Sequence, residues 1–237
     1  MKHLLLFLVV TGSLQSFSQQ LTGKQLLEKA IQYHDPKGHW ETFKGTLLIT
    51  MKSPKKASRE SEITIDLPNQ YFSVKATREK NTTEYSIDKG RVQIAFNGKN
   101  NLSEAVLKKN KLSKNRATMY QNYYTYLYGL PMKLKDEGTI INEKVEQKNF
   151  KGNDYLVLKA TYKKEVGKDT WYFYFNPKTY AMEIYQFFHD ETKNDGEYIL
   201  LTEEETINGI KMPKNRAWYM NKDDKLLGTD ILKRSFK

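Results

Sequence analysis

The sequence predicts a mainly β protein of the α+β class. We expect a single curved antiparallel sheet, a half-open β-barrel of about 11 strands, with two to three helices covering its concave face. From residue 42 to 98, and again from 138 onward, apolar residues alternate with polar ones in short runs separated by turn residues. Two segments, 22–34 and 101–128, show helical spacing instead. A curved meander must cover its apolar face, and helices can do so.

The N-terminus has the pattern of a secretory signal peptide. Lys2 precedes an apolar run at 4–10, and Ser16 and Ser18 place small residues at the −3 and −1 positions of a cleavage site. The run is shorter than the roughly 20 residues needed to span a bilayer. We predict that residues 1–18 are removed and that 19–237 form a single β domain in the periplasm. Without a cysteine after the cleavage site, no lipid anchor is expected.

Composition narrows the function classes. The 237 residues include no cysteine, which excludes disulfides, thiolate nucleophiles and cysteine metal sites. The formal net charge is +11, and the densest basic stretch is KKNKLSKNR at 108–116. This stretch is either a docking patch for an anionic surface or a solvated loop that leads into a helix. No nucleic-acid-binding motif is present, so no nucleic-acid partner is expected.

The first predicted helix covers 22–34. Thr22 can cap its N-terminus, and Pro36 and Gly38 end it. Its apolar face is formed by four residues at helical spacing: Leu26, Leu27, Ala30 and Ile31.

The stretch YHDPKGHW, 33–40, allows two interpretations. His34, Asp35 and His39 could be ligands of a metal-assisted hydrolase, since zinc sites use three or four such groups. Their spacing matches no standard metal motif. In the structural interpretation, His34 bonds free carbonyls at the helix C-terminus, Asp35 belongs to the turn, and Trp40 packs at the sheet edge. No nucleophile elbow or glycine-rich phosphate loop occurs, so we expect neither enzymatic activity nor a cofactor.

The predicted strands carry an aromatic excess in the second half of the chain. Trp171, Phe173 and Phe175 lie on one face of a strand whose other face carries Tyr172 and Tyr174. Such a strand is buried on both faces, or has one face against a ligand or partner.

The predicted helical segment 101–128 is rich in tyrosine. Its broad apolar stripe consists of Met119, Tyr120, Tyr123, Tyr124 and Leu127, with Tyr126 and Tyr128 outside it. These rings can pack on the sheet or line an apolar cavity, because a phenol buries its ring and keeps its hydroxyl wet.

Two stretches resemble the lipoprotein-carrier (LolA/LolB-like) superfamily: WYFYFNPKTYAMEIYQF at 171–187 and ETINGIKMPKNRAWYM at 205–220. Within it, YHDPKGHWETFKGTL at 33–47 resembles an exported bacterial family without an assigned function. The resemblance implies a half-open barrel with a hydrophobic cavity for acyl chains. It also implies a buried arginine that controls a lid, for which the candidates are Arg78, Arg91, Arg116 and Arg216.

The resulting prediction is a monomeric periplasmic binding or carrier protein whose cavity holds a lipid, an acyl chain or another hydrophobic small molecule. Transient contact with a protein or an anionic membrane surface is compatible with its charge. The alternatives are the metal-assisted hydrolase and a protein-interaction or sensor module. The predicted ligand-binding residues are Trp40, Met119, Tyr123, Leu127, Trp171, Phe173, Phe175 and Trp218.

Overall fold

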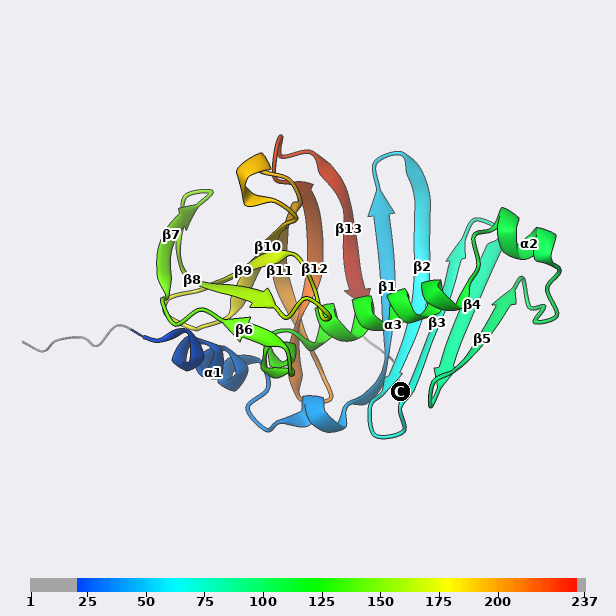
Figure 1. Cartoon of the computed structure of the whole chain (residues 1–237), viewed down its shortest axis with the longest axis horizontal. Helices are drawn as coiled ribbons and strands as arrows, with labels where there is room; N and C mark the ends of the chain where they lie inside the picture. The colour runs from blue at the N-terminus through cyan, green and yellow to red at the C-terminus, as the bar shows by residue number, and fades with distance from the viewer. Residues whose placement is uncertain (1–20, 234–237) are drawn as a thin grey trace, which may run out of the picture.

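The computed structural model describes residues 21–233, so the predicted signal peptide lies outside the described residues. One antiparallel sheet of 13 strands runs in the order β5-β4-β3-β2-β1-β13-β12-β11-β10-β9-β8-β6, and β7 pairs separately with β8 (Figure 1). β5 ends one side of this path and β6 the other, so the sheet is open. The predicted fold class is confirmed, with 13 strands in place of about 11, because two short strands, β6 and β7, pair with successive parts of β8.

The strands of the first half are β1 (Lys44–Ser53), β2 (Lys56–Asp66), β3 (Tyr71–Arg78), β4 (Asn81–Asp88) and β5 (Arg91–Phe96). Those of the second half are β6 (Thr139–Ile141), β7 (Glu146–Phe150), β8 (Asn153–Tyr162), β9 (Thr170–Phe175), β10 (Met182–Phe188), β11 (Glu197–Ile207), β12 (Ile210–Met220) and β13 (Leu226–Lys233). The helices are α1 (Gly23–His34), α2 (Glu104–Lys109) and α3 (Lys114–Gly129), with short 3-10 turns η1 (His39–Thr42), η2 (Met132–Lys135) and η3 (Glu191–Lys193).

Each half of the sheet is a meander, and the last strand joins them. β13 pairs with β12 on one side and with β1 on the other, with Ile231 opposite both Asn215 and Thr50. Turns between neighbouring strands use residues with positive φ, as at Asn208 (φ 50°) and Gly209 (φ 83°) between β11 and β12. β13 thus joins the two meanders into one continuous sheet.

Segment 101–128 does not form the continuous helix that its spacing suggests. Ser103 caps α2 by accepting from the Val106 N–H, and Ser113 caps α3 by accepting from the Arg116 N–H. Lys111, with φ of 54°, turns the chain between them. Two serine caps ten residues apart favour two helices over one.

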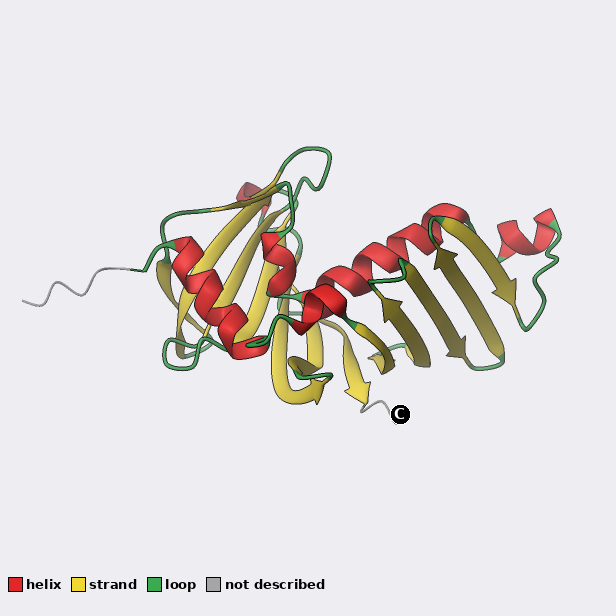
Figure 2. Cartoon of the chain, turned by 90° about the horizontal axis from the view of Figure 1, so that it is seen from below, coloured by secondary structure: helices red, strands yellow, loops and turns green. Residues whose placement is uncertain are grey.

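Helices α1 and α3 lie on the same face of the sheet, which we call the helix-covered face (Figure 2). α1 contacts β8 and β12, and α3 crosses β3, β4 and β5. Under them lies the main hydrophobic core, which includes Phe173 and Phe175. A smaller core on the opposite, outer face holds Tyr172 and Tyr174, so the β9 strand is buried on both faces.

Candidate ligand-binding site under helix α3

His34 ties α1 to the sheet. Its ring is fully buried, Nδ1 lies 2.8 Å from the Lys211 carbonyl oxygen, and Nε2 accepts the Met182 N–H at 2.9 Å. Since the carbonyl only accepts, Nδ1 carries the proton and the ring is neutral. Burial accordingly lowers the pKa of His34. The ring therefore satisfies groups of two strands, and not the free carbonyls of its own helix as predicted.

Asp35 and His39 are also engaged with the backbone. The Asp35 carboxylate accepts from the N–H groups of His39 and Trp40, each at 2.8 Å, and so holds the start of η1. His39 Nδ1 lies 2.8 Å from the Asn208 carbonyl oxygen in the β11–β12 turn. Between residues 21 and 233, no group of three or more His, Asp or Glu side chains is arranged to hold a metal. The geometry of YHDPKGHW thus supports its structural interpretation.

The predicted ligand-binding residues fall into three groups. Trp40, Leu127, Phe173 and Phe175 are buried in the main core, and Met119 is 50% exposed on the outer side of α3. Tyr123, Trp171 and Trp218 are half-buried: Tyr123 contacts Trp218, and the Tyr185 ring lies between Trp218 and Trp171. Of this group, Tyr123 and Trp171 line an open hollow on the helix-covered face.

An aromatic groove of about 540 Å³ opens beside the C-terminal half of α3. Tyr123 and Tyr126 of α3 and Trp171 of β9 line it. Tyr126 was predicted to lie outside the apolar stripe, but its ring centroid is 5.5 Å from that of Trp171. The helix sits within the curve of the sheet, so a wider part of its circumference meets other residues than an amphipathic stripe predicts.

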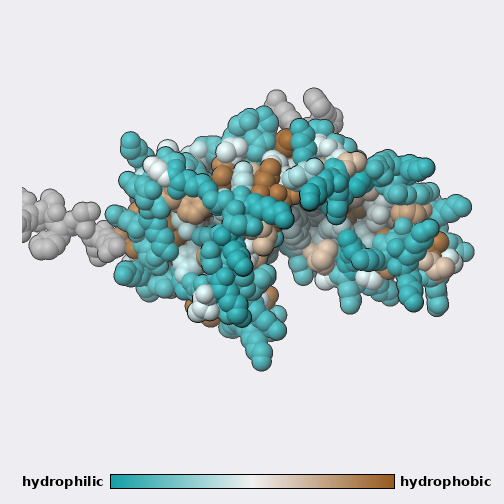
Figure 3. Space-filling model, turned by 90° about the horizontal axis from the view of Figure 1, so that it is seen from above, coloured by the Kyte–Doolittle hydropathy of each residue, from teal (hydrophilic) through white to brown (hydrophobic). Residues whose placement is uncertain are grey.

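The molecular surface offers few other apolar areas. Seen from above, it is hydrophilic over most of its extent, with a hydrophobic patch near the middle of its length (Figure 3). Exposed large hydrophobic side chains among the described residues are few: Met119, Ile140, Val166 and Leu226. Val166 also lines the aromatic groove.

Behind the groove lies a buried polar cluster whose members come from distant parts of the chain, so no local sequence pattern predicts it. Arg216 is 1% exposed, its guanidinium lies 3.8 Å from the centre of the Tyr128 ring, and Asp230 faces it across β12 and β13. Burial raises the pKa of Asp230, although the positive charges of Arg59 and Arg216 oppose this shift. Five buried atoms of this cluster lack a hydrogen bond of ordinary geometry within the described chain: Arg216 Nε, Trp218 Nε1, Asp230 Oδ1, Tyr128 OH and Tyr185 OH. Weaker side-chain contacts join Asp230 to Trp218 and Tyr123, and Tyr185 to Arg216.

Of the four arginines predicted as candidates for a buried arginine, Arg216 is the most deeply buried. Arg78 and Arg116 are half-buried, and Arg91 is exposed. Arg59, which was not considered, is half-buried and donates from Nη2 to Tyr124 OH at 3.0 Å. Strand alternation could have found it, because Arg59 is in phase with the buried Ser61 and Ile63.

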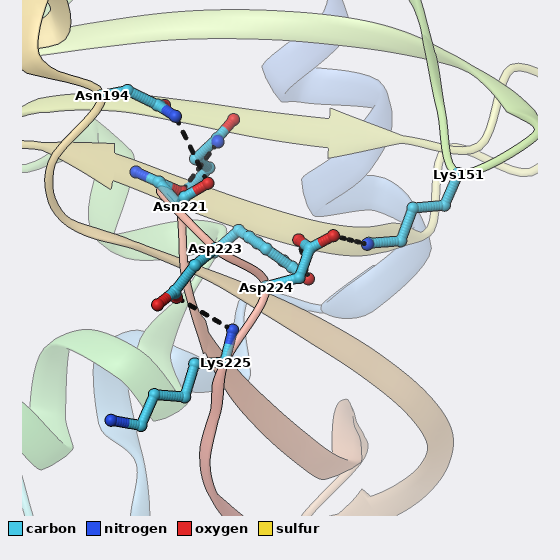
Figure 4. A network of polar contacts seen from close by, with 8 residues as sticks. Lys151, Asn194, Asn221, Asp223, Asp224 and Lys225 are labelled. Carbon is cyan, nitrogen blue, oxygen red and sulfur yellow. Dashed lines mark hydrogen bonds and ion pairs between the residues drawn. The ribbon is translucent and has the colours of Figure 1, made fainter.

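On the outer face, in contrast, polar side chains find partners. Lys151 Nζ lies 3.2 Å from Asp224 Oδ2, Asn194 donates to the Asn221 carbonyl, and the Lys225 N–H donates to Asp223 (Figure 4). These contacts hold the β12–β13 turn against β7 and η3. They have the character of structural surface contacts.

No helix in the described part of the chain is long and apolar enough to cross a membrane. This finding concerns helices alone.

The chain is similar to three solved structures at low sequence identity. A LolA superfamily protein from Nitrosomonas europaea is 12% identical over 92% of this chain and 96% of that chain, with a TM-score of 0.49. A DUF1329 family protein from Desulfovibrio piger is 10% identical over 91% and 92%, with a TM-score of 0.52. A structure described as an outer membrane lipoprotein-sorting protein domain, from Vibrio parahaemolyticus, is 11% identical over 90% and 92%, with a TM-score of 0.48.

No curated protein sequence matches the chain. At these identities the structural likeness concerns the fold alone. One family model matches residues 2–233, nearly the whole sequence, and describes a family of unknown function. The predicted placement in a family without an assigned function is confirmed, and a LolA superfamily protein is among the structures to which the chain is similar, as the sequence predicted. The chain belongs to the DUF6503 family.

Proposed function

We propose that the protein is a periplasmic binding protein whose ligand has an acyl chain or similar apolar part and lies under α3 on the helix-covered face. One observation carries this proposal: the aromatic groove adjoins a buried cluster in which five polar atoms lack a hydrogen bond of ordinary geometry within residues 21–233. In a core that serves packing alone, nearly all buried polar groups have partners. Leaving one unpaired costs about 1–3 kcal/mol.

The rings of the groove offer the apolar contact area. Tyr123 stacks on Trp218 with ring centroids 6.0 Å apart, and Trp171 stacks on Phe187 at 4.9 Å. Ligand pockets are typically apolar and aromatic with a few polar groups that fix orientation. The groove provides the aromatic lining, and the buried polar cluster provides the polar groups.

α3 could expose more of this surface by moving, because its two ends are held differently. At Gly129 the helix meets Trp40 so closely that a β-carbon there would lie 2.3 Å from the indole ring. The N-terminal half instead borders a hollow between the helix and strands β2 to β4. In this proposal the Gly129 contact is the fixed point, and opening begins at the N-terminal half by separating Tyr120 from Tyr85 of β4.

Two measurements test the proposal. Native mass spectrometry of protein purified without detergent should show a co-purifying molecule with an acyl chain. After delipidation, a fluorescent fatty-acid probe should bind saturably. Removing the indole at position 171 takes away one wall of the groove, so Trp171→Ala should weaken binding by about ten-fold, equivalent to ~1.4 kcal/mol.

Tyr219→Ala is the matched control. Tyr219 is also a half-buried ring, but it stacks on Tyr198, a residue that contacts the outer-face core, at 5.1 Å. It should leave probe affinity unchanged. Absence of saturable binding, or equal weakening by both substitutions, would contradict a ligand site under α3.

A further inference from the structure

A second hollow, of about 240 Å³, lies beside the N-terminal half of α3. We call it the arginine hollow, because it is lined by Arg59, Arg78 and Arg116, three of the five arginines in residues 21–233. Glu79 is the sole carboxylate among its described lining residues. The hollow therefore carries a surplus of positive charge.

Sheet register places two of these arginines side by side. Arg59 of β2 and Arg78 of β3 are directly opposite partners, so their side chains leave the same face of the sheet. Like charges in this relation destabilise a sheet when nothing compensates them. Arg116 approaches from α3, with its guanidinium 5.8 Å from the centre of the Tyr120 ring. Three cationic groups thus converge from two layers of the structure.

Internal contacts compensate them only in part: the charge of Asp230 acts on Arg59, but no ion pair forms. Across the described chain, no carboxylate oxygen lies within 4.0 Å of any of the three guanidinium groups. The Nε atoms of Arg59 and Arg78 are buried and have no hydrogen-bond partner there. Arg78 makes only a weak contact from Nη2 to Met51 Sδ at 4.0 Å. Exposed Arg91, in comparison, lies 3.2 Å from Asp88.

We propose that the arginine hollow binds an anionic group with several acceptor oxygens, a phosphate or a carboxylate. Guanidinium groups match such anions because their N–H groups form a planar fork. The inference rests on the proposed function in one respect: the anion would be the head of the same ligand whose acyl chain lies under α3. A free phosphate has the same chemistry and is distinguished below.

Two further features of the hollow fit an anion. The buried Tyr85 hydroxyl has no partner within residues 21–233, and burial raises its pKa to about 12, so it stays a donor at neutral pH. The basic stretch 108–116 lies beside the hollow. Its lysines are exposed, whereas Arg116 is half-buried and lines the hollow. Exposed lysines nearby raise the local concentration of anions.

Calorimetric titration of the delipidated protein separates the sources. The probes are inorganic phosphate, a short-chain lysophosphatidic acid and a neutral monoacylglycerol of the same chain length. Arg78→Gln/Arg116→Gln removes two of the three charges and should weaken binding of the anionic amphiphile at least ten-fold, with the neutral one unaffected. Arg91→Gln, which removes an exposed arginine from the same half of the sheet, should change none of the three. Thermal unfolding verifies the fold, and single Arg116→Gln replaces the double variant if that variant is unfolded.

The outcomes distinguish this inference from the proposed function. Arginine-dependent binding of the amphiphile but not of phosphate identifies a head-group site, and arginine-dependent binding of both identifies a general phosphate site. Arginine-dependent binding of phosphate without binding of either amphiphile supports the hollow and contradicts the acyl-chain proposal. If the anionic amphiphile binds no more tightly than the neutral one and phosphate does not bind, or if the arginine variants bind anions like the wild type, the inference is wrong.

Discussion

The two halves of α3 cover different chemistry. The N-terminal half borders the arginine hollow, where three guanidinium groups face one glutamate. The C-terminal half borders the aromatic groove, where the basic and acidic side chains are more evenly mixed: Lys133, Lys168, Asp136, Glu165 and Asp169. One helix thus spans a cationic region and a region of aromatic rings bordered by charges of both signs. The proposed ligand, with an anionic head and an apolar chain, would match the first region with its head and the rings of the second with its chain.

The helix-covered and outer faces differ in how well the hydrogen bonds of their polar side chains are satisfied. Around Asp224 the hydroxyl of Tyr198 donates at 2.7 Å and Lys151 adds an ion pair. Around Asp230 one buried carboxylate oxygen lacks a hydrogen bond of ordinary geometry within the described chain. The first arrangement stabilises the fold, whereas the second is costly for stability and is accounted for by the proposed binding site. The following predictions probe this contrast.

The largest effect is expected at the buried polar cluster. Arg216→Met removes the charge that faces Asp230 and leaves a buried carboxylate without it, which should cost about 3 kcal/mol. Urea unfolding followed by circular dichroism measures the loss. In Arg216→Met/Asp230→Asn both charges are gone, and we expect about half of the stability to return. A double variant no more stable than the single one would show that the two side chains are not coupled.

A smaller loss is expected at the fixed end of α3. A β-carbon at Gly129 would meet the Trp40 ring at 2.3 Å, so Gly129→Ala should destabilise the protein by about 2 kcal/mol. Gly167→Ala is the control, because its β-carbon would lie at an ordinary 3.4 Å from Tyr162. Unfolding midpoints compare the two. Equal midpoints would mean that Trp40 does not fix this end of the helix.

The effect at His34 should be confined to acidic pH. Its folded pKa lies below the unfolded value of 6.5, so its contribution to stability is complete above pH 6.5. As pH falls from 6.5 toward the folded pKa, the unfolded chain takes up a proton that buried His34 does not, and stability decreases. Unfolding curves between pH 7 and pH 5 should therefore slope less in His34→Gln than in the wild type.

His189 provides a control of opposite sign. Its pKa is raised by a hydrogen bond to Asp169, so its contribution is present at low pH and lost as pH rises through the folded pKa. His189→Gln should steepen the decrease of stability on acidification. Identical slopes in the two variants would contradict both assignments.

The smallest effect is expected on the outer face. Lys151 and Asp224 are about half exposed, and solvent and salt screen such pairs. Asp224→Asn keeps an acceptor for Tyr198 and should leave the unfolding midpoint within experimental error. A clear loss that persists at high salt would show that this face holds more than ordinary surface contacts.

Local patterns predicted most of the architecture. Alternation in β1 to β5 and β8 to β13, turn residues such as Asn208 and Gly209, and the cap of α1 at Thr22 depend on neighbours within a few residues, so they can be read from the chain. The division of 101–128 into two helices was also locally encoded, by Ser103 and Ser113. The helical spacing of the apolar residues does not by itself show this division.

The candidate site was only partly predictable. Tyr123 and Trp171, predicted because aromatic residues concentrate in their segments, line the groove, but sequence could not separate them from Phe173 and Phe175, which fill the core. Whether a ring is buried in the core or lines the groove depends on neighbours from other strands and from α3. Tyr126 and Tyr128 were misplaced because the stripe rule assumes a helix with one buried side.

By itself, the sequence determined the fold class, the strands and turns, and the likeness to LolA-type proteins, since each depends on local periodicity or local motifs. Tertiary structure alone decided that β13 joins the two meanders, that Arg59 and Arg78 are directly opposite, and that Arg216 faces Asp230. Arg59 and Asp230 are 171 positions apart in the chain, yet both lie under α3 because strand register aligned them. Charge becomes informative about function only when the sheet shows which charges have no partner.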